Sequence, residues 1–295
     1  MSDTAATVID SVFRRFDAAD LTFGHGADNA WDEAVALVLH VTGLSDQRES
    51  LETTISNSDL STINQLAQRR IVERVPLAYL FGECTYVGLS FVLEPGVMIP
   101  RSPIGHLLRD ERLDPWLHEP ARILDLCSGT GCLGIVAALQ FPNARVTLVE
   151  LDQQALAVAK HNVARHGLES RIEVVAGDVT SDGLDETLRG SWAGTWDLIL
   201  SNPPYVDDET MANRAAEYYA EPAAGLAGGG EGLDIIDAIL RRLPTWLAAQ
   251  GVFVCEVGES APAFQRNYPQ LDVVWLDLPS GGEGVFLLEA KQVHA

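Results

Sequence analysis

The tetrapeptide Asn202-Pro203-Pro204-Tyr205 carries the clearest chemical signal in this sequence. It follows residues 196–201, a short apolar run that is typical of a buried strand. The prolines end the strand and stiffen the backbone after it, so the Asn202 amide oxygen and the Pro203 carbonyl can be held as adjacent acceptors. Two acceptors suit a planar –NH2 group, with Tyr205 covering its face. The motif therefore predicts a site for a carboxamide or for the exocyclic amine of a base; the alternative is a strand-ending turn with a buried tyrosine.

A second candidate site lies between the predicted strand 122–126 and the predicted helix 132–139. The glycine-rich turn that joins them presents backbone N–H groups to a ligand. Its glycines, at positions 129, 131 and 134, fit the dinucleotide-binding fingerprint. Glu150 ends the next apolar run, where that fingerprint has its ribose-binding acid. A nicotinamide oxidoreductase is therefore one interpretation of this segment.

Asp125 favours a different ligand. It lies inside the predicted strand, four residues before the first glycine, where its charge would repel a pyrophosphate. The same charge suits a ligand with an ammonium and a sulfonium, such as S-adenosylmethionine. The alternative is that Asp125 caps the turn by accepting hydrogen bonds from loop N–H groups.

Strand and helix patterns alternate from about residue 121 onward, which predicts a parallel α/β sheet. Strands are expected at 122–126, 145–150, 171–176, 196–201, 251–257, 272–278 and 284–289. The last two are separated by no helix, and they predict an antiparallel edge. Because such sheets bind ligands at the carboxyl ends of their strands, Asp125, Glu150, Asp178 and Asn202 should converge. Asp178 could instead cap the turn or helix that follows it.

The chain divides into a small helical domain over 1–84, a hairpin or extended linker over 85–118 and a main domain over 119–295. One apolar stripe of the helical domain comprises Val8, Ile9, Val12, Phe13 and Phe16, and a second comprises Trp31, Val35, Val38 and Leu39. The long segment 207–232 contains three consecutive glycines. We interpret it as a lid over the site, with a disordered surface insertion as the alternative.

Composition limits the class of protein. The 295 residues are 47% hydrophobic, enough for one large core and a small one. No apolar run can span a bilayer and residues 1–20 lack a signal pattern, so we expect a cytoplasmic protein without membrane contact. The four cysteines are scattered, which fits a reducing compartment and predicts no metal site.

The net charge of −22 disfavours a tight grip on phosphates, and so disfavours a nucleic-acid adenine methyltransferase. It suits a basic protein partner. An acid-rich surface that serves solubility or tolerance of high salt explains the charge equally well.

Taken together, these segments resemble the Asn-Pro-Pro-Tyr class of S-adenosylmethionine-dependent methyltransferases that modify glutamine side chains, the HemK family. The resemblance runs from about residue 70 to the end of the chain. It rests on residues 79–83, 97–104, 125–131, 201–206, 221–222, 228–229, 232–234, 255–258 and 281–286. Release-factor methyltransferases of this class usually carry Pro-Arg-x-x-Thr-Glu, whereas this chain has Arg101-Ser102-Pro103-Ile104-Gly105. That departure favours the branch that acts on protein three of the large ribosomal subunit. Cys127 stands where many relatives have a glycine, so the turn there is expected to differ slightly.

The resemblance implies a Rossmann-like class I methyltransferase fold. It implies methyl transfer from S-adenosylmethionine, leaving S-adenosylhomocysteine, to the N5 amide nitrogen of a glutamine in a basic large-subunit ribosomal protein. It assigns catalysis to Asn202, Pro203 and Tyr205, which also bind the substrate together with Pro204 and Arg101. It assigns the cofactor to Asp125, Cys127, Ser128, Gly129, Thr130, Gly131, Glu150, Asp178, Val179 and Asn202.

This chemistry needs no metal and no general base, and no histidine or second carboxylate is obvious near the Asn-Pro-Pro-Tyr motif. Direct sequence-specific binding of nucleic acid is not expected. The alternatives are glutamine methylation of a release factor, adenine-N6 methylation of nucleic acid, a nicotinamide oxidoreductase, and a scaffold that binds ribosomal proteins.

Overall fold

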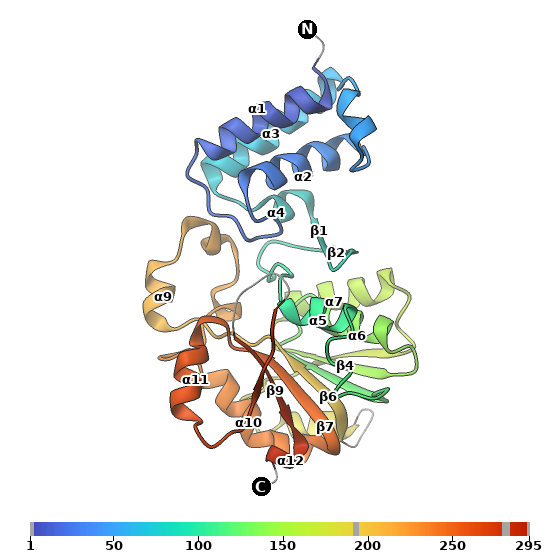
Figure 1. The fold of residues 1–295 in the computed structure, drawn as a ribbon, viewed down its shortest axis with the longest axis vertical. Helices are drawn as coiled ribbons and strands as arrows, with labels where there is room; N and C mark the ends of the chain where they lie inside the picture. Colours follow the sequence, from blue (N-terminus) through green and yellow to red (C-terminus); the bar gives the residue numbers. More distant parts are fainter. Residues whose placement is uncertain (1–2, 191–194, 279–283, 294–295) are drawn as a thin grey trace.

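A seven-stranded mixed sheet forms the centre of the larger part of the molecule, and a group of helices from the first 81 residues packs beyond one end of it (Figure 1). The computed structural model describes residues 3–190, 195–278 and 284–293. The strand order is β5-β4-β3-β6-β7-β9-β8. The strands are β3 (Arg122–Leu126), β4 (Arg145–Glu150), β5 (Ile172–Ala176), β6 (Trp196–Ser201), β7 (Leu247–Glu256), β8 (Val274–Trp275) and β9 (Val285–Glu289).

The sheet confirms the predicted fold class. Strands β3 to β7 pair in parallel, whereas β9 runs antiparallel to both β7 and β8. The chain reverses its direction of travel across the sheet between β3 and β6, which lie side by side, and this is where doubly wound sheets open a ligand crevice. Part of the matching stretch 281–286, residues 281–283, lies outside the described residues.

Helices cover both faces of the sheet, which explains why its central strands are continuous apolar runs. The helices α5 (Pro103–Arg109), α6 (Cys132–Gln140) and α7 (Gln153–Arg165) contribute to the core on one face. The helices α8 (Leu184–Gly190), α10 (Asp234–Trp246), α11 (Ala261–Asn267) and α12 (Ala290–Val293) contribute to the core on the other. A single turn, η4 (Gly258–Ser260), leads into α11. None of the helices described in the structure is both long and apolar enough to cross a membrane.

The first helices enclose a core of their own. They are α1 (Ala5–Asp17), α2 (Ala30–Thr42), η1 (Arg48–Glu52), α3 (Asn57–Glu73) and α4 (Leu77–Phe81). The stripe predicted on α1 is buried apart from the partly exposed Phe13. The stripe predicted on α2 is right at the buried Val38 but wrong at its first residue, because Trp31 is 47% exposed, and Leu37 is buried as well. Glu33 occupies the buried face, where Arg70 of α3 donates to it at 2.8 Å. Hydropathy could not reveal this partner.

A β-hairpin follows, formed by β1 (Glu83–Tyr86) and β2 (Leu89–Val92). Val87 and Gly88 both adopt positive φ, 54° and 78°, as a two-residue turn between twisted strands requires. The segment expected to hold a hairpin or extended linker, 85–118, therefore does contain most of a hairpin, which turns at Val87-Gly88 and begins two residues earlier. The Glu94-Pro95-Gly96 segment lies after it.

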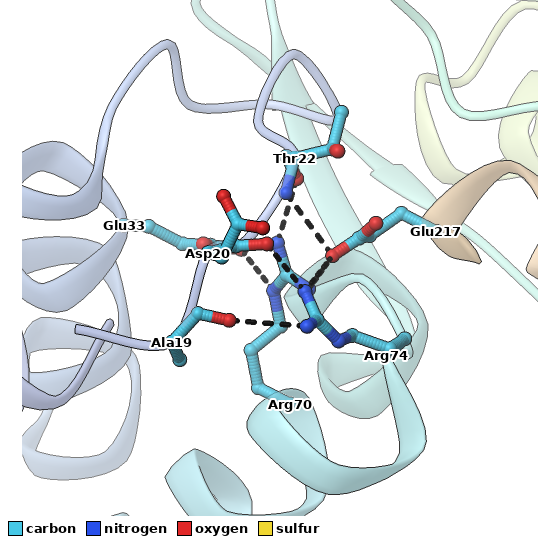
Figure 2. A network of polar contacts seen from close by, with 7 residues as sticks. All are labelled: Ala19, Asp20, Thr22, Glu33, Arg70, Arg74 and Glu217. Carbon is cyan, nitrogen blue, oxygen red and sulfur yellow. Dashed lines mark hydrogen bonds and ion pairs between the residues drawn. The ribbon is translucent and has the colours of Figure 1, made fainter. Parts of the chain in front are cut away.

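Residues 207–232, which we call the strap, connect the two parts of the molecule. The strap contains α9 (Asp208–Asn213), η2 (Ala216–Ala220) and η3 (Ala223–Gly225), so the interpretation as a disordered insertion is wrong. Glu217 of η2 is buried and accepts hydrogen bonds from the Thr22 N–H at 3.1 Å, Arg70 Nη1 at 3.1 Å and Arg74 Nη1 at 3.2 Å (Figure 2). These bonds tie the strap to the helical part.

Candidate active site

A cavity of about 480 Å³ opens at the carboxyl ends of β3, β4, β5, β6 and β7. This volume lies within the range of small-molecule sites. Most of the residues that the sequence singled out line it: Arg101, Cys127, Ser128, Gly129, Thr130, Glu150, Asp178, Val179, Asn202, Pro203, Pro204 and Tyr205. Asp125 and Gly131 are not among its lining residues. The strap contributes Pro222 and Gly225 to the wall, and the segment before α5 contributes Met98 and Ile99.

The loop after β3 keeps the conformation of a glycine turn although its first residue is a cysteine. Cys127 has φ +56° and Gly129 has φ +55°, both in the left-handed region. The Ser128 N–H donates to the Val149 carbonyl at 3.0 Å, which anchors the loop to β4. The turn therefore keeps its shape and does not differ as expected. Cys127 is strained instead, since a residue with a side chain costs about 1 to 2 kcal/mol in the left-handed region.

Glu150 lines the cavity at the end of β4. One of its oxygens accepts the Gly129 N–H at 2.8 Å, and the other accepts the N–H groups of Leu151 and Asp152 at 2.8 and 2.9 Å. The carboxylate therefore fixes the two loops that flank the cavity, and one oxygen retains an unused lone pair. Asp152 caps the helix α7 that follows.

Asp178, which follows β5, lines the cavity, and one of its oxygens accepts both the N–H and the hydroxyl of Thr180. This is the turn-capping interaction that we considered as the alternative for this residue. Val179 is buried beside Asp178 and also lines the cavity. The second carboxylate oxygen of Asp178 has no hydrogen bond among the described residues and could accept one from a ligand.

Asp125 is buried beneath the loop, with 1% exposure. One oxygen accepts the N–H of Gly134, in the first turn of α6, at 2.9 Å, and the other has no partner among the described residues. Burial raises the pKa of Asp125 to about 7, although the Gly134 hydrogen bond opposes the shift. The structure thus places Asp125 under the loop that forms the cavity wall and not at the wall itself, and its donor belongs to the first turn of α6 rather than to the loop.

The Asn-Pro-Pro-Tyr turn extends from the end of β6 into the cavity. The Asn202 side-chain oxygen is buried and has no hydrogen-bond donor among the described residues. A buried acceptor without a donor is costly, so such a group at a cavity wall indicates a place where a ligand donates. The Tyr205 hydroxyl donates to Glu256 Oε1 at 2.7 Å, and the Tyr205 carbonyl accepts the Ser260 hydroxyl at 2.7 Å.

Glu256 is the residue that the sequence reasoning missed. It ends β7, lines the cavity and is buried, and its second oxygen accepts the Ser102 hydroxyl at 2.6 Å. The expectation that no second carboxylate lies near the motif is therefore wrong. The signal was available, because Glu256 ends an apolar run at the carboxyl edge of the sheet, as Asn202 does. Burial raises the pKa of Glu256, although the bonds from Ser102 and Tyr205 oppose the shift.

Arg101 faces the cavity from the segment before α5. Its guanidinium binds Glu221 of the strap through two bonds, of 2.5 and 2.8 Å, and the Ile99 N–H donates to the same carboxylate at 3.3 Å. Glu221 therefore pins the strap to the cavity wall. His25 of the helical part lies 3.7 Å from Glu221, but burial lowers the pKa of His25 to about 4, so the ring is neutral at neutral pH.

Comparison with known proteins now identifies the family. The chain is 42% identical over 285 residues to the ribosomal protein uL3 glutamine methyltransferase of Bordetella pertussis, covering 95% of this chain and 93% of that protein. It is 40% identical to the protein of the same name from Burkholderia pseudomallei, covering 99% and 96%. This chain belongs to the ribosomal protein uL3 glutamine methyltransferases. The Methyltransferase small domain family also matches, over residues 111–245.

A solved structure of another methyltransferase has a similar fold. The hMettl16 catalytic domain, solved in complex with MAT2A 3′UTR hairpin 6, aligns with a TM-score of 0.51 at 15% identity over 83% of this chain and 86% of that one. At this identity the likeness supports the methyltransferase fold alone. The family resemblance drawn from the sequence is confirmed by the two full-length relatives.

Proposed function

We propose that this protein transfers a methyl group from S-adenosylmethionine to the side-chain amide nitrogen of a glutamine in ribosomal protein uL3, in the cytoplasm. The observation that carries the proposal is the 42% identity, over nearly the full length of both chains, to a uL3 glutamine methyltransferase. The unpartnered Asn202 oxygen at the cavity wall supports it, because a primary amide donates two hydrogens.

The cavity suits S-adenosylmethionine by its size and by its donor and acceptor groups. We assign the ribose hydroxyls to Glu150, the adenine amine to Asp178, and the adenine ring to Val179. The loop residues Cys127, Ser128, Gly129 and Thr130 form the wall beside the amino-acid end, and we assign Asp125 and Gly131 the role of holding that loop from behind. S-adenosylmethionine supplies a methyl group that its sulfonium already activates, so we propose that the reaction needs no metal.

The amide is held by the Asn-Pro-Pro-Tyr turn. Asn202 and the Pro203 carbonyl accept its two hydrogens, which aims the nitrogen at the methyl carbon and stabilises the positive charge that the nitrogen gains. Tyr205 covers the amide face and excludes water, and Pro204 keeps the turn rigid. Arg101, which Glu221 holds by two bonds, shapes the entrance through which the glutamine arrives.

We assign recognition of the basic ribosomal protein to the helical region 1–84 and to the acidic surface, while 119–295 binds the methyl donor and 85–118 links the two. The net charge of −22 favours a basic protein over nucleic acid, because like charges repel phosphates. Association with the ribosomal protein should accordingly weaken as salt rises.

The deciding assay offers uL3, a release factor and adenine-containing DNA side by side, with a labelled methyl donor. We expect label on a glutamine of uL3 alone, which mass spectrometry can locate. Label on the release factor would move the chain to the sister branch, and label on DNA would overturn the protein substrate. Calorimetric titration tests the methyl donor separately: S-adenosylmethionine should bind and NAD should not.

A further inference from the structure

Two carboxylates are buried at this site and differ in their partners: Glu256 lines the cavity, whereas Glu221 lies behind Arg101, which lines it. Glu221 is bound by both terminal nitrogens of Arg101, so a cation balances its charge. Glu256 is held by the hydroxyls of Tyr205 and Ser102. Within residues 3–190, 195–278 and 284–293, no Lys, Arg or His nitrogen forms an ion pair with Glu256. Glu256 therefore lines the cavity with a carboxylate that has no ion-pair partner there, and the charge of Arg101 acts on it only at longer range.

A buried carboxylate without an ion-pair partner is costly, so the position of Glu256 at this site calls for a function. The Tyr205–Glu256 bond joins this charge to the reacting centre, because Tyr205 lies three residues after Asn202. A hydroxyl that donates to a carboxylate forms a strong, charge-assisted bond, which fixes the phenol ring and raises its electron density.

The remaining contacts of Tyr205 leave the ring little freedom. Ser260 donates to its carbonyl, and Gly258 lies against the ring. A Cβ atom at Gly258 would lie 2.4 Å from a ring carbon, so only glycine allows this approach. Glu256, Gly258 and Ser260 thus hold Tyr205 through its hydroxyl, ring and carbonyl from a single segment at the end of β7.

We propose that Glu256 is a positioning residue that accelerates methyl transfer through Tyr205. The inference deepens the proposed function and rests on it. The amide nitrogen forms the new N–C bond with its lone pair, the electrons of the S–C bond remain on sulfur, and the nitrogen then releases one proton to water. Positive charge grows on the nitrogen until that proton leaves. The electron-rich face of Tyr205 attracts this charge, and the carboxylate of Glu256 strengthens the attraction.

The charge of Glu256 also predicts a dependence on pH. The Tyr205 and Ser102 hydroxyls bind Glu256 directly, and Arg101, Tyr86 and Cys255 interact with its charge at longer range. Protonated Glu256 carries no charge, so turnover should fall as pH drops through its pKa. Because burial raises that pKa, the fall should begin above the usual range of a carboxyl group.

The test compares Glu256→Gln, Tyr205→Phe, the double variant and Glu256→Asp with the wild type on uL3. Glu256→Gln should lower kcat by about 10- to 100-fold, the ratio for losing a hydrogen bond to a charged group, with KM for S-adenosylmethionine within about threefold. Because Glu256 acts through Tyr205, the double variant should be no slower than the slower single variant. Glu256→Asp, which keeps the charge, should keep the acid fall in kcat, whereas Glu256→Gln should lose it.

Asp197→Asn is the matched control. Asp197 lies at the opposite edge of the sheet, at the start of β6, where it accepts the Ala121 and Arg122 N–H groups. This variant should keep kcat within about twofold, as expected for a site away from the chemistry.

Additive losses in the double variant, near-normal kcat in Glu256→Gln, or an unchanged acid fall in that variant would each overturn the role of Glu256. If Glu256→Gln does not fold, Glu256→Asp decides: loss of its acid fall overturns the proposal and retention supports it. An inactive wild type would instead refute the proposed function, so the two failures are distinguishable.

Discussion

The junction around Arg70 and the cavity around Asn202 treat buried polar groups in opposite ways. Arg70 is 1% exposed, and each of its three guanidinium nitrogens donates a hydrogen bond: to Glu33, to Glu217 and to the Thr22 carbonyl (Figure 2). In the cavity, no donor among the described residues bonds the Asn202 oxygen, and none of their cations forms an ion pair with Glu256. The junction uses its polar groups to fix two parts of the chain together. The cavity leaves them available for a ligand.

Because of this difference, substitutions around Arg70 should affect stability, and substitutions around Asn202 should affect turnover. Removing the cation from a buried network of ion pairs leaves its carboxylates less compensated, so the folded state weakens. Removing an acceptor that has no partner costs the fold little, because no bond is lost. The two regions should therefore respond to the same kind of truncation in opposite ways.

The largest effect should come from Asn202→Ala. Methyl transfer to uL3 should fall by about two to three orders of magnitude, as when one preorganised hydrogen bond at a reacting centre is lost. The thermal midpoint should stay close to that of the wild type, because the Asn202 oxygen has no hydrogen bond to lose within the described part of the chain. A variant with near-normal turnover and a lowered thermal midpoint would place Asn202 with the structural residues.

The junction should give the complementary result. Arg70→Ala should lower the free energy of unfolding by about 3 to 5 kcal/mol, because it leaves Glu33 and Glu217 buried without their common cation. Arg69→Ala is the matched control one residue away. Arg69 makes an exposed pair with Glu73 on the same helix, so its loss should cost under about 0.5 kcal/mol.

Denaturant titration measures both Arg variants. Failure of Arg70→Ala to fold while Arg69→Ala folds normally supports the same conclusion. Equal unfolding free energies for the two variants would show that the junction is not a stabilising network.

The smallest effect concerns the strained loop. Cys127→Gly should leave the unfolding free energy unchanged or raise it by up to about 1 kcal/mol, because glycine adopts φ +56° without steric cost. Cys132→Gly provides the control at the other flank of the loop. Cys132 starts α6 in a buried position, so glycine there should lower the unfolding free energy by about 1 kcal/mol or more. A larger loss from Cys127→Gly than from Cys132→Gly would mean that the cysteine side chain, and not strain, dominates at position 127.

Patterns confined to neighbouring residues gave correct predictions. The strands β3, β4 and β6 were predicted with their observed bounds, because apolar runs between turn residues record burial on both faces of a sheet. The antiparallel edge followed from two strands with no helix between them. Asn202, Glu150 and Asp178 were found because a residue at the carboxyl end of a parallel strand reaches the cavity whatever surrounds it.

The other predictions failed where a residue's environment depends on a partner that is distant in the sequence. Glu33 is buried because Arg70, 37 residues later, binds it, whereas Trp31, which was expected to be buried, is exposed. The role of the strap depends on Glu217 reaching Arg70 across 147 residues. Neither contact can be predicted from local hydropathy.

The sheet, the position of the cavity and the family could all be predicted from the sequence, because strand burial and turn chemistry are local properties of single segments. Only the tertiary structure decided that Asp125 lies beneath the loop and that Glu256 holds Tyr205 across 51 residues. The reason is physical: whether a carboxylate faces a ligand, a cation or a hydroxyl depends on which segments meet in space, and many pairings are compatible with the same local pattern.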